Sequence, residues 1–569
     1  MIDGKEQTSH ADPTSAVAGR HRVLHLGHPE SHIPLYEIPD VVAPPPSRRI
    51  IGIGFAATAI VAFFGLWLEH ESEGVLDARV PLAWATPFVL LLTSIAVMPF
   101  AARHWWEHNY ARVSIALATI VAIYYLWRVH DGPGNLARVL SEYISFIFLL
   151  GSLFVVSGGI LIRVRARATP VANTAMLLSG AALANVFGTT GAAMLLIRPF
   201  LRMNKRHLCA YHVVFFIFVV ANAGGSLTPI GDPPLFLGYL LGVPFFWVFE
   251  HCWPIWVLAV GALLGVFFAV DTIAQRRGHR KDYDGDDLGP VVSFYGGVNL
   301  LFIAMIIAGI LLHTDINHWL HAKLGFEMPI RELLMAAAAF GSLATTPQRV
   351  HVENRFNYAP IKEVALLFVG IFATMLPALN YLYHAGESNR DAGTRRLTTP
   401  GQYYFTCGSL SSVLDNAPTY LTFLKTELGS LDQDLVSRAV TIMKRPSIEI
   451  TADDVNGLDA LRRDELRAAV EALMQYHGDR VSAGMLSDNE IRIGFLLGHP
   501  ELNKVLIAIS MGAVLFGAAT YIGNGPNFMI KKIADHVGAP TPGFFAYIIV
   551  YTLPVLLPIL VVIWLIFLR

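Results

Sequence analysis

The chain has little charge for its length. Of its 569 residues, 15% are Asp, Glu, Lys or Arg, whereas soluble domains contain about 25%. Hydrophobic residues make up 54% of the chain, and the mean hydropathy is +0.50. The composition therefore predicts a protein that crosses a lipid bilayer several times. The formal net charge of −1 argues against a nucleic-acid partner, which requires a basic surface.

Cysteine is scarce. Cys209, Cys252 and Cys407 lie far apart, beside or within apolar runs. They form no metal or redox pattern, so we expect them to be small buried hydrophobic residues and expect no cofactor. No cleavable signal precedes the first apolar segment, residues 50–68, so we expect that segment to stay as an anchor. Residues 1–49 are polar and predict a disordered cytoplasmic tail.

Long apolar runs cover most of the chain. Runs of a length that spans a bilayer, about 17 to 25 residues, occur at 50–68, 81–101, 113–129, 139–162, 253–270, 291–312, 329–346, 361–383 and 544–568. Two further runs are interrupted, 172–197 and 402–424, and two are broken by polar stretches, 211–249 and 502–532. We therefore expect only helices to cross the membrane, in an all-α protein.

Charged segments divide these runs into two halves. Residues 50–274 form the N-terminal half, and 275–290 form a cytoplasmic linker. The second half comprises 291–424 and 500–569, with a polar extracytoplasmic insertion at 425–499. Within the insertion, 458–476 has the apolar spacing of a solvated amphipathic helix.

One broken run carries the first candidate site, ANAGGSLTPIGDPP at residues 221–234. Its glycines permit unusual φ angles and its prolines stop a continuous helix. Asn222, Ser226, Thr228 and Asp232 supply oxygen atoms at the break. Unwound backbone at membrane depth survives only inside protein or beside a water-filled cavity, so the break predicts a binding site. A simple proline kink is the alternative, but a kink needs no aspartate.

The two halves repeat the same motifs. TPIGDPP (228–234) matches TYIGNGP (520–526), which pairs Asp232 with Asn524. Each broken run follows an interrupted run centred on an asparagine, Asn185 or Asn416. Arg and Lys gather at 163–167, 198–206 and 276–281, which marks that side as cytoplasmic. The two interrupted runs then become hairpins that open to opposite sides, and such inverted repeats with broken helices predict a secondary transporter rather than an enzyme.

The motifs NAGGSLTPIGDPP, GTTGAAMLLIRP and LDNAPTYLTFL resemble the ion transporter superfamily. That superfamily includes arsenite, citrate and dicarboxylate carriers and a branch of sodium/proton antiporters. The chain is most similar to the antiporter and presumed citrate-carrier members, over residues 50–568 without the insertion. The resemblance implies about eleven transmembrane helices in two inverted repeats, each with a re-entrant hairpin and a broken helix. It also implies a homodimer with an elevator-like motion.

The resemblance further implies where ions and substrate bind. Hairpin tips and helix breaks hold sodium and substrate in that superfamily, and the matching residues here are Asn185, Gly188, Thr189, Asn222, Ser226, Thr228, Gly231, Asp232, Asp415, Asn416, Thr419, Thr520, Gly523, Asn524 and Asn527. The dicarboxylate branch carries Ser-Asn-Thr at each tip. Here the tips read Ala-Asn-Val (184–186) and Asp-Asn-Ala (415–417), which disfavours dicarboxylate transport.

Two acidic residues guide the choice of cargo. Asp232 and Asp415, one from each half, would repel an anionic substrate unless a cation or proton intervened. The pair suits Na⁺, which prefers oxygen ligands, and also H⁺, because burial and like charge favour a protonated carboxyl group. We therefore predict Na⁺/H⁺ antiport in the plasma (inner) membrane, with Na⁺ bound by Asp232, Asp415, Asn185 and Asn416. The N-terminus would be cytoplasmic and the C-terminus outside.

Three alternatives stay open. A carrier of citrate or another carboxylate, coupled to a cation, would also tolerate the two acids. Either aspartate could simply cap the N-terminus of a half-helix. An intramembrane aspartyl protease is a more remote reading, because those enzymes need Gly-x-Gly-Asp and here Pro229 and Ile230 precede Gly231 and Asp232.

Overall fold

The computed structural model describes residues 80–279, 291–324, 329–391, 397, 399–445, 448–484 and 486–569. All of them belong to the unit Pro39–Arg569. The predicted tail (1–49), the predicted anchor (50–68) and most of the predicted linker (280–290) lie outside the described residues.

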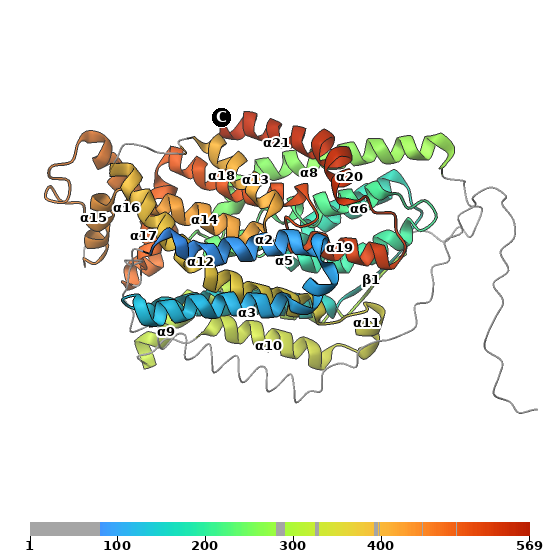
Figure 1. Ribbon diagram of the computed structural model, residues 1–569, viewed down its shortest axis with the longest axis horizontal. Coiled ribbons are helices and arrows are strands. Elements are labelled where there is room, and N and C mark those ends of the chain that lie inside the picture. The colour runs from blue at the N-terminus through green and yellow to red at the C-terminus, as the bar shows by residue number, and fades with distance from the viewer. Residues whose placement is uncertain are drawn as a thin grey trace, which may run out of the picture. The chain divides into compact units, whose positions relative to one another are not determined.

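The described residues are almost entirely helical, as the sequence predicts (Figure 1). The first half contains η1 (Leu82–Ala85), α2 (Thr86–Ala101), α3 (Arg103–Arg128), α4 (Gly132–Gly158), α5 (Pro170–Met203), α6 (Ala210–Val219), η2 (Ala223–Gly225), α7 (Pro233–Leu240), α8 (Trp247–Ala274) and η3 (Gln275–His279). The second half begins with α9 (Asn299–Leu324), α10 (Ile330–Thr345), α11 (Gln348–Glu353), α12 (Ala359–Asp391), α13 (Pro400–Val413) and α14 (Asn416–Gly429). It continues with α15 (Gln433–Met443), α16 (Ala460–Ala483), α17 (Asp488–Gly498), α18 (Pro500–Phe516), η4 (Gly517–Ala519), α19 (Gly525–His536), α20 (Phe544–Tyr547), η5 (Ile548–Leu556), α21 (Leu557–Ile563) and η6 (Trp564–Leu568).

Eight stretches of helix in the described part of the chain are long and apolar enough to cross a membrane. They lie at Leu82–Pro99, His104–Arg128, Gly132–Gly158, Pro170–Met203, Trp247–Arg277, Ala359–Tyr381, Pro500–Ala519 and Phe544–Leu568. The protein is therefore a multi-pass membrane protein. The count of about eleven spans stays a prediction.

The two halves are joined by a short antiparallel ribbon. Strand β1 (Leu161–Arg165) pairs with β2 (Val291–Tyr295). The predicted membrane runs 139–162 and 291–312 included the start of β1 and all of β2, and this is wrong: α4 ends at Gly158 and α9 begins at Asn299. The segments LIRVR and VVSFY are rich in β-branched and aromatic residues, which favour strands. The ribbon places the C-terminal end of α4 beside the N-terminal end of α9.

Helix α5 folds back on itself at Gly188, and we call residues 170–203 hairpin 1. Gly188 has φ +72° and ψ 157°, a conformation that glycine tolerates and other residues rarely adopt. A methyl group added at Gly180 would come within 3.2 Å of Leu196 Cδ1. In a straight helix these two positions would lie about 24 Å apart along the axis. The two arms of hairpin 1 are therefore antiparallel neighbours.

Helices α13 and α14 form a second reversal, hairpin 2 (residues 400–429). Leu414 and Asp415 separate the two helices. The hydroxyl of Tyr403 donates a hydrogen bond to Glu427 across the two arms, although a straight helix would separate these residues by about 36 Å. The interrupted run at 402–424 is thus a helical hairpin.

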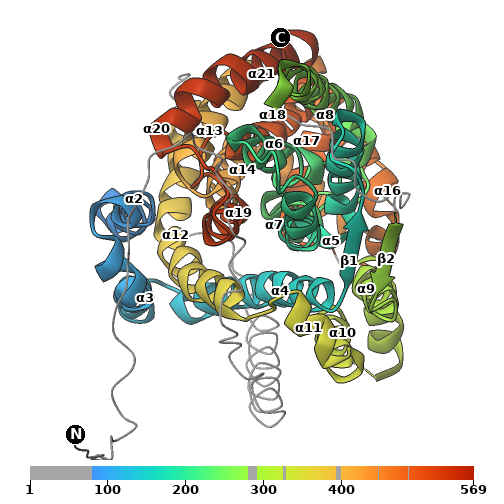
Figure 2. The ribbon, with the colours of Figure 1, turned by 90° about the vertical axis from the view of Figure 1, so that its right-hand side faces the viewer.

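Both broken runs are interrupted as the sequence predicts. The first stops at Val219 and resumes at Pro233, and the second stops at Phe516, continues through η4 and resumes at Gly525. Two further helices pass beside the hairpins and the first break (Figure 2). Helix α4 contacts α5 of hairpin 1 and α7, and α12 contacts α14 of hairpin 2. That the two halves are inverted across a membrane stays a prediction.

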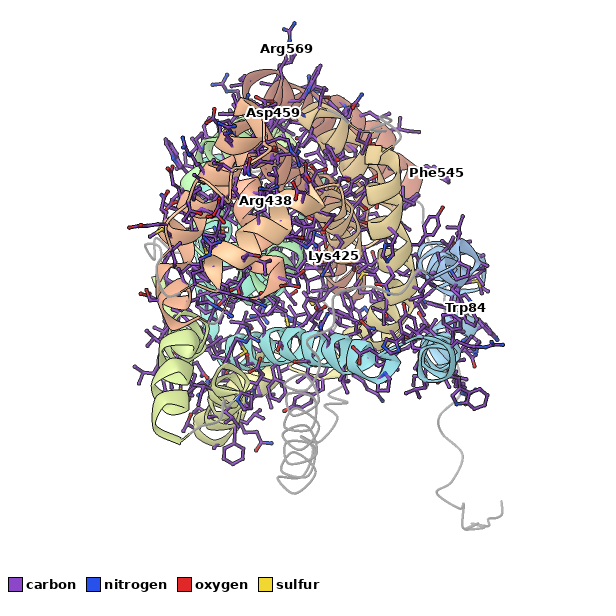
Figure 3. The ribbon with its side chains drawn as sticks, turned by 90° about the vertical axis from the view of Figure 1, so that its left-hand side faces the viewer. Trp84, Lys425, Arg438, Asp459, Phe545 and Arg569 are labelled. Atoms are coloured by element: carbon purple, nitrogen blue, oxygen red, sulfur yellow. The ribbon has the colours of Figure 1, made fainter. Side chains whose placement is uncertain are left out.

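The polar insertion is also helical. The amphipathic helix expected at 458–476 is α16, which Asp459 caps by accepting a hydrogen bond from the Arg462 amide at 2.8 Å. Figure 3 labels Asp459 together with Arg438 of α15. Between α15 and α16, Arg445 and Asp454 form a two-pronged ion pair, at 2.7 Å and 2.6 Å.

Candidate functional site

The carboxylate of Asp232 lies fully buried between the two halves of the chain. Its Oδ1 accepts hydrogen bonds from Thr189 Oγ1 and Asn524 Nδ2, both at 3.0 Å. Its Oδ2 accepts one from Asn416 Nδ2 at 2.6 Å. Thr189 comes from hairpin 1, Asn416 from hairpin 2 and Asn524 from the second helix break, so three separated segments meet on one carboxylate.

Asp232 is not a helix cap. It directly precedes α7, but its side chain forms no capping hydrogen bond. The capping alternative is therefore wrong for Asp232. Its carboxylate is directed to side-chain donors instead.

Asp415 behaves differently. Its carboxylate accepts a hydrogen bond from the backbone amide of Ala417 at 3.1 Å, and so caps α14. It is half-buried, and no hydrogen bond joins it to Asp232 among the described residues. The capping alternative accounts for the contact that Asp415 makes here.

The two helix breaks share one local structure. The Gly231 amide donates to Thr228 Oγ1 at 3.1 Å, and the Thr228 hydroxyl donates to the carbonyl of Asn185 at 2.7 Å. In the second break the Gly523 amide donates to Thr520 Oγ1 at 3.1 Å. The Thr520 hydroxyl donates to the carbonyl of Ser412 at 2.6 Å. Each break is thus fastened to its own hairpin by the same threonine.

These contacts correct the pairing of the hairpin residues. The counterpart of Asn185 is Ser412, because each accepts the threonine hydroxyl three residues before the hairpin turn. The counterpart of Asn416 is Thr189, since each begins the second arm and donates to Asp232. Pairing Asn185 with Asn416, as the sequence analysis did, is therefore wrong by one helical turn. Matching the two turns themselves, Gly188 with Asp415, would have given the correct register.

Several predicted site residues hold the backbone and do not contact Asp232. The Asn185 side chain donates to the carbonyl of Gly224 at 2.7 Å and accepts from the Leu227 amide at 3.0 Å. Ser226 donates to the carbonyl of Ala223, and Thr419 to that of Asp415. Asn185 is thus placed to shape the first break.

A chain of three asparagines joins the two breaks. Asn524 Nδ2 donates to Asn222 Oδ1 at 3.1 Å, and Asn222 Nδ2 donates to Asn527 Oδ1 at 2.7 Å. Asn527 then donates to the carbonyls of Gly517 and Thr520 at 2.8 Å and 2.9 Å. All three asparagines are buried. The network fixes the side-chain orientation of Asn524 toward Asp232.

Two predicted glycines are required by close backbone approach. A methyl group on Gly231 would lie 2.1 Å from the carbonyl oxygen of Gly225, and one on Gly523 would lie 2.7 Å from that of Gly517. Both separations are far below a van der Waals contact. The breaks can close only with glycine at these positions.

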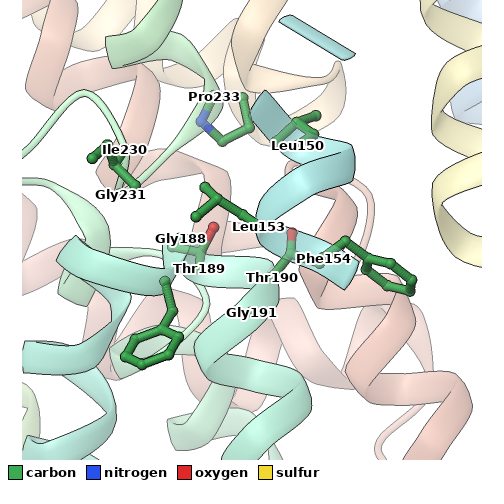
Figure 4. A pocket seen from close by; sticks show the side chains of 11 residues that line it. Leu150, Leu153, Phe154, Gly188, Thr189, Thr190, Gly191, Ile230, Gly231 and Pro233 are labelled. Carbon is green, nitrogen blue, oxygen red and sulfur yellow. The ribbon is translucent and has the colours of Figure 1, made fainter. Parts of the chain in front are cut away.

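A cavity lies beside the tip of hairpin 1 (Figure 4). Its volume is about 20 Å³, which is room for about one water molecule. Its lining consists of Leu150, Leu153 and Phe154 of α4, residues 187–191 of hairpin 1, and Ile230, Gly231 and Pro233. Thr189 lines this cavity and also donates to Asp232, so a water molecule or small ion held here would touch the hydrogen-bond network of the carboxylate.

A family model described as putative citrate transport matches residues 77–568. The chain belongs to the putative citrate transport family. This confirms the resemblance to the ion transporter superfamily and its citrate-carrier branch, and it supports a transporter rather than an enzyme. No curated protein matches the chain by sequence.

In this member of the putative citrate transport family, four helices begin at the site. They are the second arm of hairpin 1 at Thr189, α14 at Asn416, α7 just after Asp232 and α19 just after Asn524. A helix N-terminus carries a partial positive charge and favours a nearby anion. These helix ends would stabilise Asp232 in its ionised form, and no described Lys or Arg side chain is hydrogen-bonded to it.

The site also contains one oxygen atom to which a ligand could bind. Asn416 Oδ1 is buried and has no hydrogen-bond partner within the described residues. It belongs to the amide group that donates to Asp232. No group of three or more His, Cys, Asp or Glu side chains that could hold a metal occurs in the described part of the chain. A Na⁺ site of one or two aspartates with amide oxygens would not form such a group, so that site stays a prediction.

Proposed function

We propose that the protein is a secondary transporter that carries citrate or a related carboxylate across the membrane together with a coupling cation. One observation carries this proposal: four helix N-termini meet around a single buried carboxylate, Asp232. This arrangement favours negative charge, and the chain belongs to the putative citrate transport family. The same helix ends would favour a substrate carboxylate near Asp232.

The buried carboxylate supplies the coupling. When Asp232 is ionised, the Thr189, Asn416 and Asn524 side chains all donate to it. A substrate carboxylate about 4 Å away would be repelled by about 4 kcal/mol at an effective dielectric constant of 20. A Na⁺ ion or a proton on Asp232 removes that repulsion. The cation therefore binds before the substrate.

Na⁺/H⁺ exchange is the second candidate function. It is favoured by Asn416 Oδ1, the buried oxygen without a hydrogen-bond partner that adjoins Asp232. Na⁺ is a hard cation that prefers carboxylate and amide oxygens. Exchange requires only that Asp232 binds either Na⁺ or H⁺ in turn.

Transport assays in proteoliposomes distinguish the two functions. The purified protein would be given radiolabelled citrate under an inward Na⁺ gradient, an inward proton gradient or no gradient. We expect citrate to accumulate under at least one gradient, and we expect Asp232→Asn to abolish this accumulation. If citrate is neither accumulated nor exchanged, and added Na⁺ instead collapses an imposed pH gradient, the second function is correct.

We also propose that the chain lies in the plasma membrane with its N-terminus cytoplasmic and its C-terminus outside, as a homodimer. The basic residues near β1 and after α5, including Arg163 and Arg202, support this orientation. A cysteine placed near Arg277 should be protected from a membrane-impermeant thiol reagent in intact cells, and one placed near Leu461 should react. The opposite pattern would reverse the orientation.

A further inference from the structure

Each hairpin carries a cationic side chain on its second arm, buried in the case of Lys425 and half-buried in the case of Arg198. Arg198 lies on the second arm of hairpin 1, and Lys425 lies on α14 of hairpin 2. Arg198 is nine positions beyond Thr189, and Lys425 is nine positions beyond Asn416. Thr189 and Asn416 are counterparts because each begins its arm and donates to Asp232. The two cations therefore occupy equivalent places, each about 13 Å along its arm from the central site.

Among the described residues, no acidic side chain is hydrogen-bonded to either cation. Lys425 is only 7% exposed, and within the described residues its ammonium group forms no hydrogen bond or ion pair. Nη1 of Arg198 is buried and has no hydrogen-bond partner in the same part of the chain. A charge held in a membrane protein without a partner is costly and usually marks a path for a charged substrate.

The surroundings of both side chains are rich in positive charge. Lys425 interacts electrostatically with one acid, Glu142, most strongly, and then with two basic residues, Arg138 and Arg492. Arg198 interacts with Arg202 and Arg355. A cation such as Na⁺ would be repelled from both places, whereas a carboxylate would be attracted.

The two cations lie near opposite ends of α4. Arg138 and Glu142, beside Lys425, are in the N-terminal part of α4. Arg355, beside Arg198, follows Asn354, whose side chain donates to the carbonyls of Gly158 and Ile160 at 2.9 Å and 2.6 Å. Arg138 and Gly158 are about 30 Å apart along the helix, which is the thickness of a bilayer core.

The candidate cavity lies between these two positions. Leu150, Leu153 and Phe154, in the C-terminal third of α4, line it. Lys425 is labelled in Figure 3, where it lies between the orange helices of the second half and the cyan α4. Along α4, the position of Lys425 therefore comes first, the cavity second and the position of Arg198 last.

We propose that Lys425 and Arg198 are two equivalent anion-binding access sites, one toward each side of the membrane, that hold a carboxylate group of the substrate before it enters and after it leaves the central site. This rests on the proposed carboxylate transport. Each access site raises the local concentration of a multiply charged anion at one mouth of the pathway. Because neither cation is neutralised by a bonded acid, its charge remains available to an incoming carboxylate.

The proposal predicts effects that depend on the side of the membrane. Citrate KM would be measured from outside in intact cells and from the cytoplasmic side in inside-out vesicles, for Lys425→Met and Arg198→Met. We expect Lys425→Met to raise KM about tenfold on the side where α14 ends, which the charge distribution predicts to be outside. Arg198→Met should raise KM on the other side. The maximal rate should change less than about twofold, because the central site is intact.

Conservative variants separate charge from packing. Lys425→Arg and Arg198→Lys should keep KM close to that of the unaltered protein. Lys504→Met is a matched control, since Lys504 is exposed and paired with Glu501 at 3.0 Å. Added salt should narrow the difference in KM between Lys425→Met and the unaltered protein, because salt screens the attraction between the lysine and the substrate. If a methionine variant is poorly folded, Lys425→Cys or Arg198→Cys treated with an aminoethylating reagent restores a positive charge, and KM should then recover.

Several results would overturn the proposal. An unchanged KM, an equal increase of KM on both sides, or failure of the conservative and aminoethylated variants to restore KM would each do so. These results differ from failure of the proposed function, in which the unaltered protein itself moves no citrate or other carboxylate. If both methionine variants instead lowered transport only in vesicles rich in anionic lipid, the cations would bind lipid headgroups and the access role would be rejected.

Discussion

The two hairpins have the same backbone plan and different side chains. In each, the second arm begins beside Asp232, and the threonine of a helix break donates to a carbonyl three residues before the turn. Hairpin 1 turns at Gly188 with a positive φ, whereas hairpin 2 turns at Asp415 with φ −61° and a side-chain cap. The shared features build the scaffold, and the differences decide what binds to it.

The helix breaks show the same contrast at the central position. Asp232 in the first break faces Asn524 in the second, and their side chains are hydrogen-bonded at 3.0 Å. One half of the molecule therefore provides the negative charge, and the other half provides an amide donor of nearly the same shape. Two ionised aspartates at this distance would repel each other, so the asymmetry allows the single carboxylate to be ionised without that repulsion.

The largest effect is expected from moving this charge. Asp232→Asn should reduce cation-coupled accumulation of substrate to background, because it removes the group that binds the coupling ion while keeping the side-chain shape. The double variant Asp232→Asn with Asn524→Asp places the carboxylate at the equivalent position and should restore part of the activity. Accumulation in proteoliposomes is the measurement, and full accumulation by Asp232→Asn alone would falsify the role of the carboxylate.

The next largest effect distinguishes the two asparagines that the sequence pairs. Asn416→Ala removes the buried Oδ1 atom that has no hydrogen-bond partner among the described residues. Loss of this cation ligand, worth about 1.5 to 3 kcal/mol, should lower the apparent Na⁺ affinity at least about tenfold. Asn185→Ala should leave that affinity nearly unchanged and lower the melting temperature, because Asn185 holds the backbone of the first break. The half-saturating cation concentration of transport measures the first effect. Equal effects of both variants on affinity would restore the pairing of Asn185 with Asn416.

The two turns should differ in their tolerance of alanine. Gly188→Ala forces a side chain into a backbone region nearly restricted to glycine, at a cost of about 1 to 3 kcal/mol in the free energy of unfolding. Asp415→Ala keeps an ordinary backbone and loses only the cap of α14, which costs about 1 kcal/mol. Thermal unfolding in detergent compares the two variants. A more stable Gly188→Ala than Asp415→Ala would contradict the description of the first turn.

The smallest effect concerns the insertion, which follows hairpin 2 and has no counterpart after hairpin 1. The guanidinium of Arg445, with hydrogen bonds from Thr451, holds the pKa of Asp454 well below its ordinary value. A lowered pKa in the folded state means that the ionised group stabilises the fold above about pH 4, and that this stabilisation is lost as the pH falls further. Asp454→Asn should therefore speed limited proteolysis of the insertion at pH 7.

The pH dependence provides the check on that prediction. The difference in the rate of proteolysis between Asp454→Asn and the unaltered protein should narrow as the pH falls below about 4. The rates would be measured with a protease that is active across this pH range. Transport at pH 7 should be almost unchanged, because the hydrogen bonds of the Asp454 side chain go to Arg445 and Thr451 within the insertion, and none in the described part of the chain reaches the Asp232 site. A difference that widens at low pH would contradict the ion pair.

Much of the fold follows from local sequence. Apolar length predicts the helices, and the glycines and prolines around Asp232 predict the breaks, because these residues cannot continue a helix. Strand β2 was not predicted, because Val291 and its neighbours are as apolar as a membrane helix. Only their pairing with β1 distinguishes them from a helix. Local sequence contains no information on such a partner far along the chain.

The candidate site was predicted in composition more than in geometry. The sequence indicates that Asp232, Asn416 and Asn524 belong to the site, and the structure brings them into contact. It does not reveal that Asn185 serves the backbone or that Asp415 caps α14, because an amide or a carboxylate can do either. Only the register of the turns, which depends on tertiary contacts, assigns each side chain its role.

The ribbon of β1 and β2 has a consequence for how the chain is made. β2 is synthesised only after hairpin 1, the first broken helix and α8, all of which lie between the two strands. Closing so long a loop is entropically unfavourable, although the cost grows only slowly with length. The first half therefore cannot complete its own tertiary structure while it leaves the ribosome. Strand β1, directly after α4, therefore stays unpaired until β2 at the start of the second half has been synthesised.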